Sequence, residues 1–333
     1  MSKKKIIALL SGGLDSQLAV KIMQKKFDVI AVAIKTPFCD FDCGKGCGSE
    51  IRKKADDLGV DLKTVYLGDE YIKMLQNPKY KFGSGMNPCI DCRSMMFKSA
   101  KKYMKEINAE FIISGEVLGQ RPMSQHKKAL KIIENESNLV GKIVRPLSGK
   151  LLPKTNPEKN GLITRNDLNG IRGRTRKSQL RLAKKFEINN PPNAGGGCLL
   201  TDKLFAQKIR DLFKYVKNPT MNDIELLKVG RHFRFDLSNR LIVGRDKKEN
   251  EIIESLMLSR DALFYVRDHM GPTALLRGNK LDHYKRIASQ IILRYSDAPI
   301  NKDANVVFKF ENIKEINIKY TNKSSYAKYR ISL

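Results

Sequence analysis

The sequence predicts an α/β fold in which a doubly wound parallel sheet is followed by a smaller α+β domain. Apolar runs of strand length alternate with helical patterns in the first part of the chain, which is typical of parallel β–α–β units. After about Asp202 this alternation is replaced by a series of short β-like runs. A chain of 333 residues also exceeds the usual size of one hydrophobic core, so we expect two domains, at residues 1–205 and 220–333.

The elements of the first domain follow from the spacing of its apolar residues. Aliphatic runs predict strands at 6–10, 29–34, 62–67 and 111–114, and helical patterns predict helices at 16–26, 50–58 and 95–107. Ligands of such sheets bind beyond the carboxyl ends of the strands. We therefore expect the segments that follow strands 6–10, 29–34 and 111–114 to share one rim of the sheet.

The second domain follows a helical stretch and the linker candidate Asn218-Pro219-Thr220. Its apolar runs are short, which favours an α+β arrangement. The predicted strands are 232–235, 240–243, 262–266, 273–276, 306–310 and 316–320.

The most informative motif is Ser11-Gly12-Gly13-Leu14-Asp15-Ser16, directly after the first predicted strand. The two glycines leave backbone N–H groups uncovered, and Ser16 opens a helix whose N-terminus attracts anions. Such a loop suits the β and γ phosphates of ATP. It lacks the Gly-Lys-Ser/Thr ending of the Walker motif and the third glycine of the dinucleotide fingerprint. A Gly-Gly turn without a ligand is the alternative.

The charge of the chain indicates a polyanionic partner. Lys and Arg number 63 against 35 Asp and Glu, which gives a net charge of +28. The segment from Gly170 to Gln179 concentrates cations on a loop that enters a helix, where arginines can bind phosphates of RNA. A basic surface without a partner, and a solvated helix face in this segment, are the alternatives.

No apolar stretch reaches membrane-spanning length, and the apolar run near the N-terminus is too short for a signal peptide. We therefore expect a cytoplasmic protein with no membrane partner. The six cysteines are then more typical of catalysis or metal binding than of disulfides.

Cys89 and Cys92 form a C-x-x-C just before a predicted helix, and Cys198 follows three glycines. A thiolate at a helix N-terminus beside Arg93 is expected to have a lowered pKa, so Cys92 is a candidate nucleophile or ligand. Three further cysteines are spaced at intervals of four, where a second metal site is the alternative to unreactive loop cysteines. They are Cys39, Cys43 and Cys47.

The loop Ser11–Ser16 resembles that of PP-loop ATP pyrophosphatases, which split ATP into AMP and pyrophosphate. The resemblance implies an adenine nucleotide α-hydrolase-like fold, ATP and Mg²⁺, with Asp15 holding the metal. The segment after the fourth predicted strand resembles the family's second nucleotide-contacting segment, so Gly115 is expected to leave room for the nucleotide and Arg121 to face a phosphate. The full set of expected nucleotide contacts is Ser11, Gly12, Gly13, Asp15, Ser16, Lys35, Gly115 and Arg121.

The stretch 87–98 resembles the cysteine segment of tRNA 2-thiouridylases, with Cys92 on their catalytic cysteine, and 180–198 resembles the segment that carries their second cysteine. Cys89 departs from those enzymes and matches an iron–sulfur subset of tRNA thiolation enzymes. That resemblance implies a [4Fe–4S] cluster on Cys89, Cys92 and Cys198. A metal-free persulfide relay through Cys198 or Cys92, and a purely structural role, are the alternatives.

The segments around Gly230, Gly244 and Gly271 resemble the RNA-binding domain of NFACT proteins over about residues 222 to 300. The aromatic core of that family is altered here, at 262–266. Cationic contacts to RNA are expected through Arg231, Arg245, Lys247, Arg267 and Arg277. A protein-contact or dimerisation domain is the alternative.

These resemblances together imply a tRNA thiouridine synthase with Asp15, Cys92 and Cys198 as its catalytic residues. It would adenylate a uridine carbonyl and replace the oxygen by sulfur, with 4-thiouridine at tRNA position 8 favoured over 2-thiouridine at the wobble position. A small-molecule adenylating ligase or amidotransferase and a non-catalytic RNA-binding factor are the rivals. The expected partners are tRNA and a sulfur donor, either sulfide or a cysteine desulfurase, and a homodimer is compatible with the sequence.

Overall fold

The computed structural model describes residues 3–39, 47–189, 198–321 and 324–331. The chain divides into two compact units, Met1–Leu199 and Leu200–Leu333. The domain limits expected from the sequence, 1–205 and 220–333, stay a proposal. Among the described residues, no helix has both the length and the apolar character that a membrane span requires.

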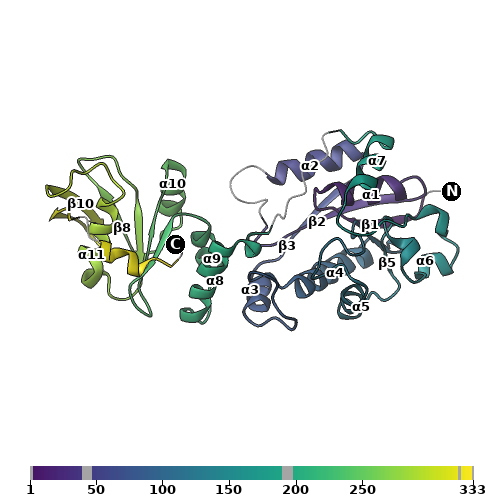
Figure 1. Cartoon of the computed structure of the whole chain (residues 1–333), viewed down its shortest axis with the longest axis horizontal. Coiled ribbons are helices and arrows are strands. Elements are labelled where there is room, and N and C mark those ends of the chain that lie inside the picture. The colour runs from purple at the N-terminus through teal and green to yellow at the C-terminus, as the bar shows by residue number, and fades with distance from the viewer. Residues whose placement is uncertain (1–2, 40–46, 190–197, 322–323, 332–333) are drawn as a thin grey trace. The chain divides into compact units, whose positions relative to one another are not determined.

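The first unit is built on a parallel sheet whose five strands run in the order β3-β2-β1-β4-β5 (Figure 1). The strands are β1 (Lys5–Leu9), β2 (Asp28–Lys35), β3 (Leu62–Tyr66), β4 (Ile112–Ser114) and β5 (Ile143–Val144). The order reverses at β1, because β2 and β3 extend the sheet on one side and β4 and β5 on the other. The doubly wound parallel sheet predicted from the sequence is confirmed, and its switch point lies between β1 and β4.

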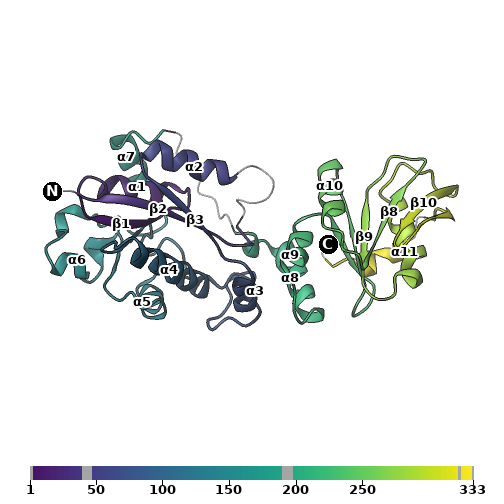
Figure 2. The ribbon, with the colours of Figure 1, turned by 180° about the vertical axis from the view of Figure 1, so that it is seen from behind.

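Side chains of β1 alternate between two helical layers. Ile6 and Ala8 join the core that contains α1 (Leu14–Met23) and α2 (Cys47–Leu58), whereas Ile7 and Leu9 join the core that contains α4 (Cys89–Glu106) and α5 (Lys127–Glu136). The two layers lie on opposite faces of the sheet (Figures 1 and 2). Burial on both faces explains why β1 is a continuous apolar run. The remaining helices are α3 (Asp69–Gln76), α6 (Asn156–Lys159) and α7 (Lys177–Lys185).

Two helices begin earlier than the sequence suggested, and both shifts affect the site. Helix α1 begins at Leu14 rather than Ser16, so Asp15 lies in its first turn. Helix α4 begins at Cys89 rather than near residue 95, so the whole C-x-x-C lies in its first turn.

The second unit contains a separate antiparallel sheet in the order β11-β10-β8-β9-β7-β6. Helix α11 (Leu281–Leu293) covers one face, and α9 (Met221–Lys228) and α10 (Lys247–Ser255) contribute to the core on the other. Helix α8 (Lys203–Tyr215) precedes them. The strands are β6 (Arg231–Arg234), β7 (Arg240–Val243), β8 (Asp261–Val266), β9 (Ala274–Arg277), β10 (Asp303–Lys309) and β11 (Ile313–Lys319), which confirms the predicted α+β class.

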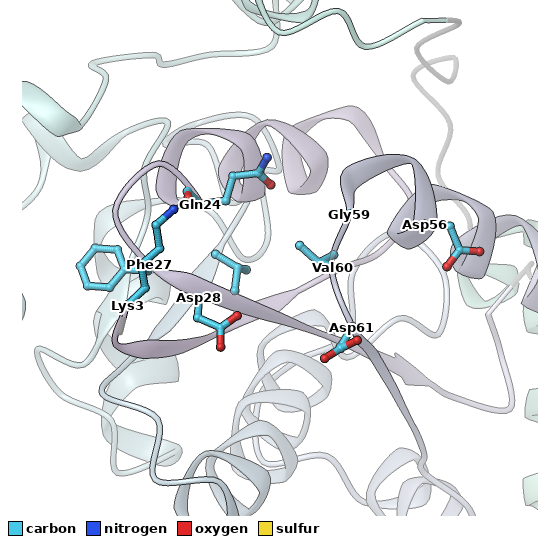
Figure 3. Close-up of a pocket in the computed structure, with 9 residues that line it drawn as sticks. Lys3, Gln24, Phe27, Asp28, Asp56, Gly59, Val60 and Asp61 are labelled. Atoms are coloured by element: carbon cyan, nitrogen blue, oxygen red, sulfur yellow. Dashed lines mark hydrogen bonds between the residues drawn. The ribbon is translucent and has the colours of Figure 1, made fainter. Parts of the chain in front are cut away.

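An open hollow of about 820 Å³ lies at the amino ends of β1, β2 and β3 (Figure 3). Asp28, Asp56 and Asp61 line it together with Lys3 and Gln24. This is the opposite edge of the sheet from the Ser11–Ser16 loop, so the hollow is separate from the site described next.

Candidate nucleotide and thiol site

The loop after β1 is held by its own hydrogen bonds. The hydroxyl of Ser16 donates to the carbonyl of Gly13 at 2.7 Å and accepts from the backbone N–H of Ser11 at 3.3 Å. Gln17 Nε2 donates to the carbonyl of Gly12 at 3.0 Å. Gly12 has a φ of +76°, a conformation that glycine adopts without strain. The result is a closed turn that ends at the N-terminus of α1, where a phosphate is favoured.

Asp15 combines burial with an unsatisfied oxygen. Its Oδ2 accepts a hydrogen bond of 2.9 Å from Gln120 Nε2, while Oδ1 is buried without a hydrogen-bond partner among the described residues. Burial raises the pKa of Asp15 above the usual 3.8, although the positive charges of Arg176 and Arg121 act against the rise. Mg²⁺ is commonly held by one or two carboxylates together with substrate phosphates. A carboxylate with one unused oxygen beside a phosphate loop therefore fits such an ion.

Gly115 follows β4 and lies against the first turn of α1. A Cβ at this position would sit 2.5 Å from the carbonyl carbon of Asp15 and 2.5 Å from the nitrogen of Ser16. The missing side chain makes room for the α1 backbone, and this close approach fixes the loop at the switch point. The expected contact of Gly115 with a nucleotide stays a prediction.

Lys35 and Arg121 lie at the expected rim but in different surroundings. Lys35 ends β2, is largely buried, and has its Nζ 5.3 Å from the ring centroid of Tyr66. The side chain of Arg121 is exposed, and its charge lowers the pKa of Asp15, so it lies near the loop. An incoming phosphate can therefore meet Arg121 more readily than Lys35.

The segment from Gly170 onward is attached to the same rim. Arg172 forms an isolated parallel β-bridge with Leu118, and Gly173 N donates to the carbonyl of Leu118 at 2.8 Å. Arg176, at the start of α7, is near enough to Asp15 to lower its pKa. Arg176 of this basic segment thus places a positive charge near the loop 11–16, whereas the side chain of Arg174 is exposed.

Cys92 lies in a less reactive setting than the sequence suggested. The side chain of Tyr71, from α3, hydrogen bonds to it. Burial raises the pKa of Cys92 to about 12, and the charge of Arg93 reduces this rise only in part. The expected lowering of the pKa by the helix N-terminus and the neighbouring arginine is therefore wrong, because desolvation of the thiolate is the larger effect.

Cys198 and Cys39 lie close to Cys92, since both thiols contribute to raising the pKa of Cys92 and of Tyr71. Cys39 lies four residues beyond the end of β2 and forms an isolated antiparallel β-bridge with Cys198. The structure thus brings together two of the three predicted ligands, and it adds Cys39, which the sequence analysis had left among the loop cysteines.

Cys89 has a different partner, since its Sγ accepts a hydrogen bond of 3.1 Å from Asn87 Nδ2. Within the described residues, no three His, Cys, Asp or Glu side chains lie together in a way that could hold a metal ion. As placed, the thiols of Cys89, Cys92 and Cys198 therefore do not fit the three corners of a cluster. Cys43 and the three glycines before Cys198 lie outside the described residues.

Arg277 of the second unit is not available to RNA. It is 6% exposed and pairs with Asp261 at 2.6 Å and with Asp223 at 2.8 Å. Arg240 also pairs with Asp223, so two arginines and two aspartates form one buried network. The expected RNA contact through Arg277 is wrong, because a buried guanidinium with both carboxylates engaged is structural.

The other predicted RNA contacts lie nearer the surface. Arg231 stacks over the ring of Tyr295 at 4.4 Å, Arg245 pairs with Glu249, and Arg267 pairs with Glu315. Lys247 is exposed. A hollow of about 450 Å³ in the same unit is rich in cations that the sequence analysis did not select, and its lining residues are Gln207, Arg210, Asp211, Arg234, Lys328, Tyr329, Arg330 and Ile331.

Comparison with known families matches each unit to a different model. The family described as thiamine biosynthesis protein (ThiI) matches residues 1–153. Residues 1–153, here called the ThiI-type domain, are therefore similar to this family. The family described as NFACT protein RNA binding domain matches residues 230–330. The PP-loop and NFACT resemblances stated from the sequence are therefore confirmed.

Curated relatives of the ThiI-type domain carry names from tRNA thiolation. A tRNA-specific 2-thiouridylase MnmA from Leptospira interrogans is 32% identical over 119 residues, which are 30% of this chain and 32% of that protein. A protein named probable tRNA sulfurtransferase from Thermococcus kodakarensis is 30% identical over 155 residues, 44% of this chain and 37% of that protein. The chain thus spans about a third of the length of these relatives.

A solved 4-thiouridine synthetase in complex with RNA and bound ATP is 19% identical, with a TM-score of 0.41. The likeness covers 68% of this chain and 52% of that chain.

Sequence reasoning missed two glutamines of the first unit. Gln120 binds Asp15 directly, and Gln179 is fully buried on α7 with an amide close enough to lower the pKa of Asp15. Neither amide atom of Gln179 has a hydrogen-bond partner within normal distance among the described residues. One signal in the sequence could have found Gln179. It lies one turn before Ala183, on the buried face of α7, where a polar side chain is unexpected.

Proposed function

We propose that this chain is an ATP-dependent tRNA sulfurtransferase that activates a uridine carbonyl and replaces its oxygen by sulfur. One observation carries the proposal: a phosphate loop with an incompletely satisfied carboxylate follows β1, and Cys39, near which Cys92 and Cys198 lie, follows β2 at the same carboxyl rim of the parallel sheet. Activation of the uridine needs the phosphate loop and its carboxylate, and sulfur transfer needs the thiols. The names of the curated relatives agree with this class of reaction.

In the activating half, the chain binds and orients ATP and its ion. The loop 11–16 and the N-terminus of α1 hold the β and γ phosphates, and Asp15 holds Mg²⁺ through Oδ1. Arg176 and Arg121 supply positive charge on the same side. ATP, when bound, supplies the adenylyl group that turns the uridine oxygen into a leaving group.

In the sulfur half, we favour a persulfide on a cysteine over a cluster. The observation behind this preference is that Cys89 pairs with Asn87 while Cys92 and Cys198 lie with Cys39. The [4Fe–4S] cluster on Cys89, Cys92 and Cys198 stays the alternative, and iron analysis after anaerobic purification tests it. For the persulfide route the proposed donor is a cysteine desulfurase, whose own persulfide supplies sulfur at the required oxidation level. Sulfide, which forms a persulfide only with an oxidant, would be the donor for the cluster alternative.

The proposed substrate is tRNA, with 4-thiouridine at position 8 as the product and 2-thiouridine at the wobble position as the alternative. The NFACT-type domain and the net charge of +28 support an RNA substrate. Relatives bear names of both a 2-thiouridylase and a general tRNA sulfurtransferase, so nucleoside analysis must decide the position.

The test is reconstitution with the full chain, ATP, Mg²⁺, unmodified tRNA, a cysteine desulfurase with cysteine as the persulfide donor, and a dithiol reductant, followed by mass spectrometry of nucleosides. We expect one thionucleoside, one AMP and one pyrophosphate per event, and loss of all three in Asp15→Asn. Asp57→Asn makes the same charge change at an exposed position of α2 and should retain activity. Formation of AMP without any dependence on tRNA would instead support a small-molecule ligase. Absence of both AMP and a thionucleoside with the unsubstituted protein would refute the proposal.

A further inference from the structure

The pairing of Cys39 with Cys198 has a specific geometry. The two residues are directly opposite in an antiparallel bridge, and the adjacent hydrogen bond runs from Leu199 N to the carbonyl of Phe38 at 3.0 Å. A bond that flanks the pair in this way marks a pair that exchanges no backbone hydrogen bonds between its own two residues. In such pairs the Cα atoms are about 4.5 Å apart and both side chains project from the same face.

This geometry suits a disulfide. Two cysteines can be bridged without backbone movement when their Cα atoms lie between about 4.4 and 6.8 Å apart. Two contacts also fix the position of the Cys39 sulfur: the N–H of Thr36 donates to Sγ at 3.3 Å, and Thr36 Oγ1 lies 3.2 Å from it. Neither cysteine is fully buried.

The third nearby thiol is held by another element. Cys92 belongs to α4 and interacts with Tyr71, whose ring centroid lies 5.7 Å from that of Phe38. Cys92 has no backbone pairing with Cys198 in the described structure that would compare with the bridge to Cys39. Of Cys39 and Cys92, Cys39 is therefore the cysteine whose backbone pairs with that of Cys198 in the described structure.

We propose that Cys39 is the resolving thiol of sulfur transfer and closes a disulfide with Cys198. This inference rests on the proposed function for its chemistry, but the pairing itself can be tested without it. It assigns a catalytic role to a cysteine that the sequence analysis had placed among unreactive loop cysteines.

A persulfide donor loads Cys198 with one sulfur atom, and the terminal sulfur attacks the activated carbon of the base, so that AMP leaves with the original oxygen. The thiolate of Cys39 then attacks Sγ of Cys198, which forms the Cys39–Cys198 disulfide and expels the second sulfur on the base as the thiocarbonyl. The proton lost by Cys39 is balanced by the proton gained at the base, and a dithiol reductant supplies two electrons and two protons to reopen the disulfide.

The first experiment tests the pairing alone. The reduced full chain is treated with one equivalent of diamide, blocked with N-ethylmaleimide and digested without reductant by trypsin and Asp-N. The cuts separate Cys39, in peptide 36–39, from Cys43, in a peptide that begins at 42, and release Cys198 in peptide 186–201. We expect a disulfide between peptide 36–39 and peptide 186–201 in the unsubstituted protein. The same product should form in Cys43→Ser, and it should be absent in Cys39→Ser. Linkage of Cys198 to Cys92 or to Cys43, or no linkage, would overturn the pairing.

The second experiment tests the role. A persulfide-loaded protein is given ATP and labelled tRNA for a single turnover without reductant. In Cys39→Ser we expect thiouridine release to fall at least about tenfold, because the attacking thiol is absent. A protein–RNA adduct that dithiothreitol releases should accumulate instead. If Cys39→Ser releases thiouridine normally, or if only Cys92→Ser traps the adduct, the role belongs elsewhere. If the unsubstituted protein makes no thiouridine while the disulfide forms, the proposed function fails and the pairing stands.

Discussion

Gly115 approaches the peptide bond between Asp15 and Ser16 so closely that no other residue fits there without displacing α1. The contact joins the end of β4 to the start of α1, across the point where the strand order of the sheet reverses. Its consequence is that the phosphate loop and the carboxylate beside it are positioned by backbone packing as well as by hydrogen bonds.

Gly115→Ala should impair activation. Its Cβ must move the α1 backbone, and overpacking of this kind destabilises proteins by about 1–3 kcal/mol. We expect a lower melting temperature and a larger proportional loss of AMP formation. AMP formation that falls no further than the fraction of folded protein would show that the contact does not position the loop.

Asp15→Asn should stabilise the fold while removing activity. The pKa of Asp15 is raised in the folded chain, so the folded state favours the protonated form and loses stability as pH rises through that pKa. The variant should therefore melt higher than the unsubstituted protein at pH 7, and the difference should shrink as pH falls below the usual 3.8. Thermal melts across this range, read beside AMP release, check both halves. A variant that is less stable at pH 7 would contradict the burial argument.

The sequence predicted the sheet and its rim well because these depend on local patterns. The strand runs and the glycines of the 11–16 loop each leave a signal within a few residues. The environment of Cys92 could not be predicted in this way, since its raised pKa depends on Tyr71 and on burial among segments distant in the chain. The pairing of Cys39 with Cys198 is equally non-local, because most of the sequence of the first unit separates the two cysteines.

Arg277→Met should destabilise the second unit rather than weaken RNA binding selectively. Removing one partner from a buried ion pair leaves an uncompensated charge and costs about 3–5 kcal/mol. Lys247→Ala, at an exposed position, should leave stability unchanged and reduce RNA affinity with a smaller salt dependence. Denaturant unfolding and RNA titrations at two salt concentrations separate the effects. Unchanged stability in Arg277→Met would contradict a structural role for the network.

Lys208→Met should remove a pH-dependent component of stability. Lys208 Nζ donates to the carbonyls of Leu227 and Gly230 at 3.1 and 3.2 Å, and burial lowers its pKa to about 8 from the usual 10.5. Between these values the unfolded chain binds more protons, so this lysine makes stability rise with pH. We expect the unsubstituted protein to gain stability relative to Lys208→Met from about pH 8 to 10.5. Exposed Lys203→Met should show no such difference; a parallel pH profile for both variants would count against the assignment.

The position of β1 in the sheet also governs when the loop can form. Ile7 pairs with Ile30 on one side but with Ile112 on the other, and Gly115 lies just beyond that second partner. Contacts between residues so far apart in the chain close slowly during folding, because a long segment must first be brought together. We therefore expect the loop 11–16 to take its final form during synthesis only after β4 has been made, so that the proposed binding of ATP begins once the central part of the first unit has folded.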